Sequence, residues 1–88
     1  MIVEIELDRG DKAEIDSLEG NMLTFRSPRA FPPGAPIRFS VMIDEHRRAF
    51  EGRSIGATRI EGDLFEVRMR FVNLRRDDRE ALLAAMRS

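Results

Sequence analysis

The chain has 88 residues, of which 42% are hydrophobic, and it contains no cysteine. A chain of this length is expected to form one domain, 1–88, with a small core that packing rather than disulfides must stabilise. The net charge is −1, with 15 basic and 16 acidic side chains mixed along the chain. This balance argues against a dedicated nucleic-acid binder, which carries a basic excess on one face.

The sequence also lacks the signals of membrane insertion and export. No apolar run is long enough to cross a bilayer, and residues 1–4 do not have the basic start of a signal peptide. The absence of cysteine agrees with a reducing compartment. We therefore expect a cytoplasmic protein with no membrane span.

Short runs in which apolar and polar residues alternate make up most of the chain, and alternation of this kind is typical of half-buried strands. The pattern predicts six strands, at residues 2–7, 12–16, 22–26, 37–43, 50–60 and 64–72. In the second strand Ala13 and Ile15 are predicted to face inward. The third strand leaves two inward faces open, Leu23 with Phe25 or Met22 with Thr24.

The connections between these strands carry turn residues. Residues 31–36 contain three prolines, which remove backbone donors, so they are predicted to form a surface connection. Residues 44–48 are predicted to form a polar hairpin loop. Gly52 and Gly56 predict a bend or bulge in the fifth strand.

From Asn73 onward the hydrophobic spacing becomes helical, with apolar residues three and four apart. A terminal helix of about a dozen residues is marginal alone in water, so Leu82, Leu83 and Met86 are predicted to dock over an opening of the barrel. Asn73 is a candidate N-cap. Six strands with short turns and one helix predict a small all-β fold, a six-stranded antiparallel β-barrel with one C-terminal α-helix.

Residues that could carry enzymatic chemistry are few. The sole histidine, His46, lies in a polar loop without a second histidine or a cysteine, which makes a poor metal site. The serines have only this histidine as a possible base. The sequence therefore predicts no enzyme, no metal and no cofactor.

The arginines of the helix start, Arg75 and Arg79, are four residues apart and could clamp an anion on one helix face. Asp77 and Asp78 lie between them and would compete for their charge. We therefore favour a surface network in which these side chains satisfy one another.

The segment 15–22 is the one whose chemistry decides function. Asp16 and Ser17 beside Gly20 and Asn21 could offer a carboxylate and backbone N–H groups to a small polar ligand. The same residues suit a plain hairpin, because glycine supplies positive φ and asparagine tolerates it. From the residues alone we favour the hairpin.

The order of elements resembles a PilZ domain, the bacterial receptor module for the second messenger cyclic di-GMP. The matching segments are 15–24, the Pro-Gly approach to 37–43, the strand 50–60, and the ending from Glu66 into Arg79-Glu-Ala-Leu-Leu. The resemblance covers residues 13–86 and implies a six-stranded barrel with a terminal helix, in agreement with the pattern above.

The chain departs from the arginine part of the ligand signature that the resemblance implies. PilZ receptors carry two arginines separated by three residues before the barrel, and these clamp the guanines and phosphates. Here Arg9 is the only arginine before Asp16, and Arg75 and Arg79 have the spacing at the wrong end of the chain. Losing two charge-assisted contacts of roughly 1.5–3 kcal/mol each would weaken binding by about two to four decades.

The second part of the signature, an Asp/Asn-x-Ser-x-x-Gly turn, matches here in two registers. One register places Asp16 at the acidic position and Asn21 in place of the glycine. The other matches Ser17 and Gly20 but places Ile15 at the acidic position. We prefer the first, because asparagine preserves the backbone shape of the turn.

The resemblance implies a non-enzymatic signalling or adaptor domain that contacts an unidentified protein, in motility, surface attachment or envelope regulation, with cyclic di-GMP binding lost or weak. The alternative is a genuine cyclic di-GMP receptor in which Arg9, or arginines of a second subunit, join Asp16, Ser17, Gly20 and Asn21. A monomer and a homodimer both stay open. A nucleic-acid-binding barrel is the weakest reading, since the phenylalanines fall at inward positions.

Overall fold

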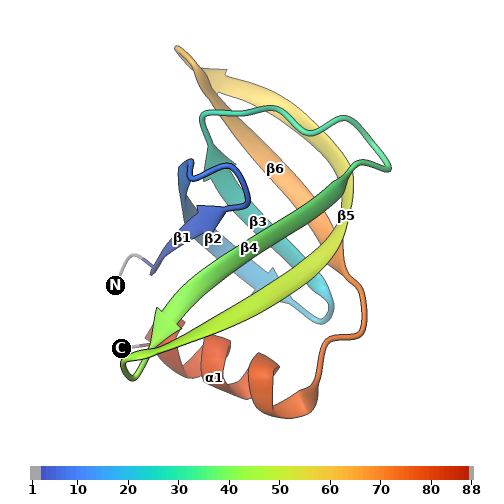
Figure 1. Cartoon of the computed structure of the whole chain (residues 1–88). Coiled ribbons are helices and arrows are strands. Elements are labelled where there is room, and N and C mark those ends of the chain that lie inside the picture. The colour runs from blue at the N-terminus through green and yellow to red at the C-terminus, as the bar shows by residue number, and fades with distance from the viewer. Residues whose placement is uncertain (1–2, 88) are drawn as a thin grey trace.

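A computed structural model describes residues 3–87, which form an antiparallel barrel of six strands with a helix across one end (Figure 1). The elements are β1 (Val3–Leu7), β2 (Lys12–Glu19), β3 (Met22–Ser27), β4 (Pro36–Ile43), β5 (His46–Glu61), β6 (Leu64–Phe71) and α1 (Arg76–Arg87). Around the closed barrel the strands follow the order β1-β2-β3-β6-β5-β4. The predicted small all-β fold is confirmed; Ile2, the first residue of the first predicted strand, lies outside the described residues.

The barrel closes between β1 and β4, where pairing is brief. Glu6 pairs with Ser40 and Leu7 pairs with Phe39. By contrast, β4 and β5 pair along the whole of β4, from Pro36 to Ile43. Among the described residues, the β1–β4 seam is therefore the part of the barrel wall with the fewest paired positions.

The core follows from the alternation of apolar residues along each strand, because successive side chains point to opposite faces. In β4 the inward residues are buried, as predicted: Ile37, Phe39, Val41 and Ile43. In β3 the inward face is Leu23 with Phe25, both 0% exposed, which resolves the alternative left open by the sequence.

Three phenylalanines from different strands form the aromatic part of this core. The rings of Phe39 and Phe50 stack with centroids 5.2 Å apart, and Phe71 lies 6.2 Å and 5.9 Å from them. Such pairs add to the stabilisation that burial alone supplies.

The two glycines of β5 mark two different irregularities. Gly52 lies opposite Phe71, where the backbone of β6 comes so close that no side chain fits. A β-bulge lies between Ser54 and Gly56, as the glycines predicted. These features let one long strand curve around the barrel.

The proline-rich connection after β3 is less exposed than the sequence predicted. Phe31 is buried in the core, and Pro36 is the first residue of β4 rather than part of the connection. Ser54 holds the connection down, because its hydroxyl donates a 2.8 Å hydrogen bond to the Phe31 carbonyl oxygen. The expected surface connection therefore contains an anchor residue.

The hairpin between β4 and β5 is also tighter than the predicted loop 44–48. Ile43 pairs with His46, so only Asp44 and Glu45 form the turn. Both have positive φ, 52° and 68°, which is the pattern of a type I′ turn. His46 and the two arginines after it belong to β5.

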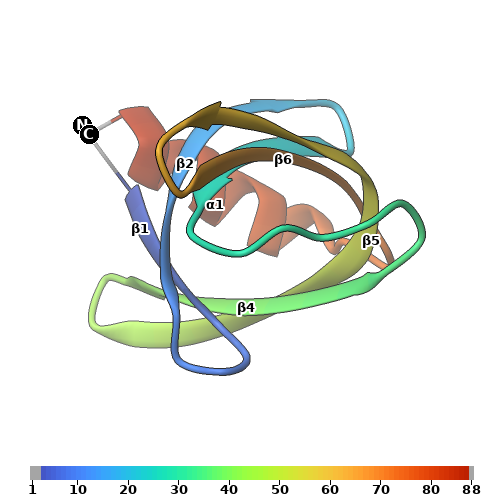
Figure 2. The same ribbon diagram turned by 90° about the horizontal axis from the view of Figure 1, so that it is seen from above.

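Helix α1 lies across one opening of the barrel, as the view along the barrel shows (Figure 2). Leu82 is 0% exposed and belongs to the core, and Met86 packs against it, as predicted. Leu83 is only half-buried and does not join the core cluster; Ala81 and Ala85 do so instead. The prediction for Leu83 is wrong because the helix face that packs on the barrel is formed by Ala81, Leu82, Ala85 and Met86, and Leu83 lies at its flank.

Candidate functional site

The segment that the sequence selected as decisive forms the hairpin between β2 and β3. Glu19 pairs with Met22, which leaves Gly20 and Asn21 as the two turn residues. Gly20 has a φ of 59°, and Asn21 is not among the residues with positive φ. This combination suits a type II′ turn, whose first position takes glycine. The predicted hairpin is confirmed.

A β-bulge in β2 sets the directions of Asp16 and Ser17. The register with β3 shifts between Ile15 and Ser17, so Asp16 is the extra residue. As a result Ile15 and Leu18 both face the core although they are three residues apart. Asp16 is exposed, and Ser17 lies beside Thr24 on the outer surface.

The turn is held by the C-terminal part of the chain through its two carbonyl oxygens. Arg79 Nε donates a hydrogen bond of 3.1 Å to the Gly20 carbonyl, and the Phe71 N–H donates one of 2.9 Å to the Asn21 carbonyl. The structure thus brings Asp16, Ser17, Gly20 and Asn21 together in one hairpin. The Arg79 side chain contacts this hairpin through a hydrogen bond to its backbone.

Arg9 does not join them. It lies exposed in the turn between β1 and β2, at the opposite end of β2 from Gly20 (Figure 1). The eight residues of β2 span roughly 26 Å at the usual rise per residue of a strand. Within one chain Arg9 and the hairpin are therefore too far apart to hold one small ligand.

The start of α1 differs from the sequence prediction in two ways. The Arg79 N–H bonds to the Arg75 carbonyl oxygen, so Arg75 occupies the N-cap position and Asn73, with a φ of 55°, precedes it. The expected network among the neighbouring charges does not form within residues 3–87. Asp78 instead pairs with Arg48 of β5 at 2.7 Å and ties the helix to the barrel.

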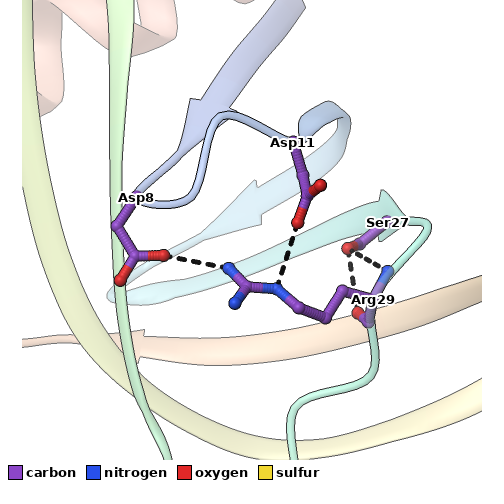
Figure 3. Close-up of polar contacts among 4 residues, drawn as sticks. All are labelled: Asp8, Asp11, Ser27 and Arg29. Carbon is purple, nitrogen blue, oxygen red and sulfur yellow. Dashed lines mark hydrogen bonds and ion pairs between the residues drawn. The ribbon is translucent and has the colours of Figure 1, made fainter.

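A second cluster of charges, which the sequence analysis missed, joins the β1–β2 turn to the connection after β3 (Figure 3). Arg29 Nη2 lies 2.9 Å from Asp8 Oδ1, and Arg29 Nε lies 3.3 Å from Asp11 Oδ2. The guanidinium also lies 4.7 Å from the ring centroid of Phe31. Ser27 fixes the backbone here, because its hydroxyl accepts from the Arg29 N–H and donates to the Arg29 carbonyl, both at 2.9 Å.

These contacts hold the pKa of Asp8 below its ordinary value, mainly through the hydrogen bond from Arg29. The pKa of Glu6 is lowered in the same way, mainly by the hydrogen bond from Arg47 and also by its charge. No local motif signals the Arg29 cluster, because its partners become neighbours only when the barrel closes.

The remaining side chains considered for catalysis or metal binding are serines and the single histidine. Ser27 and Ser54 are buried and bonded to backbone atoms, and His46 is exposed at the start of β5. Within residues 3–87 no group of three or more histidine, cysteine or acidic side chains could hold a metal ion.

Comparison with protein-family models, curated proteins and solved structures finds no match for this sequence. Among the helices of residues 3–87 none is long and apolar enough to span a membrane.

Proposed function

We propose that this chain is a non-enzymatic signalling or adaptor domain of the PilZ type that acts through protein–protein contacts and has lost, or nearly lost, cyclic di-GMP binding. The proposal places it in the bacterial cytoplasm, in motility, surface attachment or envelope regulation. Its support is the order of elements, which resembles the family, together with the closed six-stranded barrel and its helix.

One observation carries the loss of ligand binding, namely that the arginine pair of the signature, which the resemblance places before the barrel, is missing from this chain. Arg9 lies at the far end of β2, and the Arg79 side chain is bonded to the Gly20 carbonyl. Bidentate arginine contacts are the strong ones in phosphate recognition, so a domain without the arginine pair of the signature holds a dinucleotide weakly.

The test is a calorimetric titration of the purified domain with cyclic di-GMP. We expect no saturable heat at micromolar ligand, and binding at micromolar or tighter affinity would refute the proposed loss. If binding is found, the Arg9→Ala variant distinguishes a receptor that uses Arg9 from a receptor that uses arginines of a second subunit. A weakened titration would implicate Arg9, whereas an unaltered curve in a dimeric protein would point to arginines of a second subunit.

A further inference from the structure

We propose that the outer surface of β5 and β6 beside β3 binds an acidic, partly apolar segment of a partner protein. We call this surface the arginine face; it consists of Arg53, Arg68, Arg70, Met22, Ile55 and Val72. The inference rests on the proposed function as a protein-contact domain and names the contact surface and the chemistry of the partner.

The arginines of this face repel one another. Arg53 of β5 and Arg70 of β6 are direct cross-strand partners, and like charges in such pairs are destabilising. Arg68 is the next outward residue of β6, and its guanidinium lies over Gly56, 3.8 Å from where a glycine Cβ would stand. Three cations thus share one small area of the barrel wall.

Carboxylates do not neutralise this charge. Within residues 3–87 the side chains of Arg68 and Arg70 form no ion pair or hydrogen bond, and the Arg53 side chain bonds only to the Gly34 carbonyl oxygen, at 3.0 Å. Glu19, opposite Met22, and Glu66, two residues before Arg68, flank the face, and in the described part of the chain neither forms an ion pair with its arginines. Several other barrel arginines are paired with acids: Arg26 with Glu14, Arg38 with Glu51 and Arg47 with Glu6. An anionic partner would relieve the repulsion that the free domain retains.

Apolar side chains lie among these cations. Met22, Ile55 and Val72 are 38%, 37% and 41% exposed, and they make up half of the large exposed apolar side chains of the described residues. Ile55 and Val72 line a shallow hollow of 410 Å³ together with Arg53 and Arg70. A partner that fits must therefore offer apolar side chains between its carboxylates.

The same surface is poorly suited to nucleic acid. Binding of single strands needs exposed aromatic rings for base stacking. Here Phe25, Phe31, Phe39, Phe50 and Phe71 are buried and Phe65 packs against the core. Both β5 and β6 are also paired on both sides, so the partner docks by side chains and does not add a strand.

The test is an NMR titration of isotope-labelled full chain with a peptide of alternating glutamate and leucine, and with the same peptide carrying lysine in place of glutamate. We expect saturable amide shifts at Met22, Arg53, Ile55, Arg68, Arg70 and Val72 with the acidic peptide only, and weaker binding as salt is raised. This map is made on the unaltered protein and does not depend on any variant.

Two double variants distinguish binding at the arginine face from a general effect of the protein's net charge. R53E/R70E reverses the charge of the face, and we expect it to raise the dissociation constant by about tenfold or more. R75E/R76E changes the net charge equally at the start of α1, where acidic residues suit the helix dipole, and should leave binding unchanged. Equal loss in both variants, or shifts that map elsewhere, would overturn the inference.

A single-stranded RNA oligonucleotide that shifts the same amides more strongly than the peptide would also overturn it. The cyclic di-GMP titration fails or succeeds independently of this experiment. A domain that binds neither ligand refutes the arginine face and leaves the loss of cyclic di-GMP binding standing. A domain that binds both refutes that loss and retains the arginine face.

Discussion

Individual residues in β5 show that glycine serves this barrel in two different ways. At Gly52 an added Cβ would overlap the Arg70 carbonyl oxygen and the Met69 side-chain methyl group. At Gly56 the nearest atom is Arg68 Nη2, the mobile end of a long side chain, at 3.8 Å. Neither glycine has a positive φ, so space rather than backbone conformation distinguishes them.

The Gly52→Ala variant should be destabilised by about 1–3 kcal/mol, because the backbone of β6 must move to accommodate the methyl group. Gly56→Ala is the matched control and should change the free energy of unfolding by no more than about 0.5 kcal/mol. Chemical denaturation of both variants checks this, and equal destabilisation would contradict the close approach at Gly52.

The Asp8–Arg29 contact predicts a pH-dependent effect of a single substitution. Because the folded-state pKa of Asp8 is lowered, its carboxylate stabilises the fold above its unfolded pKa, and this contribution is lost as pH falls through the folded pKa. At pH 7 Asp8→Asn should cost a few tenths of a kcal/mol to about 1 kcal/mol, since the pair is open to solvent.

This difference from the unaltered protein should shrink as the pH falls below about 4. Denaturation series at several pH values measure it. In a carboxylate NMR titration, Arg29→Ala should raise the pKa of Asp8 toward its ordinary value. The pKa of Glu6, which depends on Arg47, serves as the internal control and should not change. A cost of Asp8→Asn that is independent of pH would contradict the pair.

At the scale of elements, α1 shows where sequence patterns suffice and where they do not. The existence of α1 and the packing of Leu82 and Met86 against the core follow from helical spacing. The cap and the docked face do not, because Leu82 and Leu83 are equally apolar and only the barrel opening selects between them. Asn73 takes a positive φ before the helix, which its residue type allows, rather than capping it.

The Leu82→Ala variant should lose about 2–4 kcal/mol of stability, because it leaves a cavity beneath the helix. Leu83→Ala, on the half-buried flank, should lose less than about 1 kcal/mol. Thermal or chemical unfolding of the two variants provides the comparison. A larger loss for Leu83 would mean that the helix docks with the neighbouring face.

For the molecule as a whole, alternation predicted the barrel because each strand buries one face, and strict alternation such as that of β4 leaves little freedom. The bulge at Asp16 could not be predicted, because no glycine marks it in the sequence. The extra residue reverses which of the following side chains face the core. The contacts of Arg29 depend on two connections that meet only after closure. The arginine face depends likewise on the register of β5 with β6, which places Arg53 opposite Arg70.

The measurement that tests this account most directly is a backbone amide NMR titration with cyclic di-GMP, observed at the turn residues Gly20 and Asn21. Because the arginine pair of the signature is missing before Asp16, these two amides should show no saturable shift at micromolar ligand. Saturable shifts at these two amides in that range would contradict the account and would identify the chain as a working receptor.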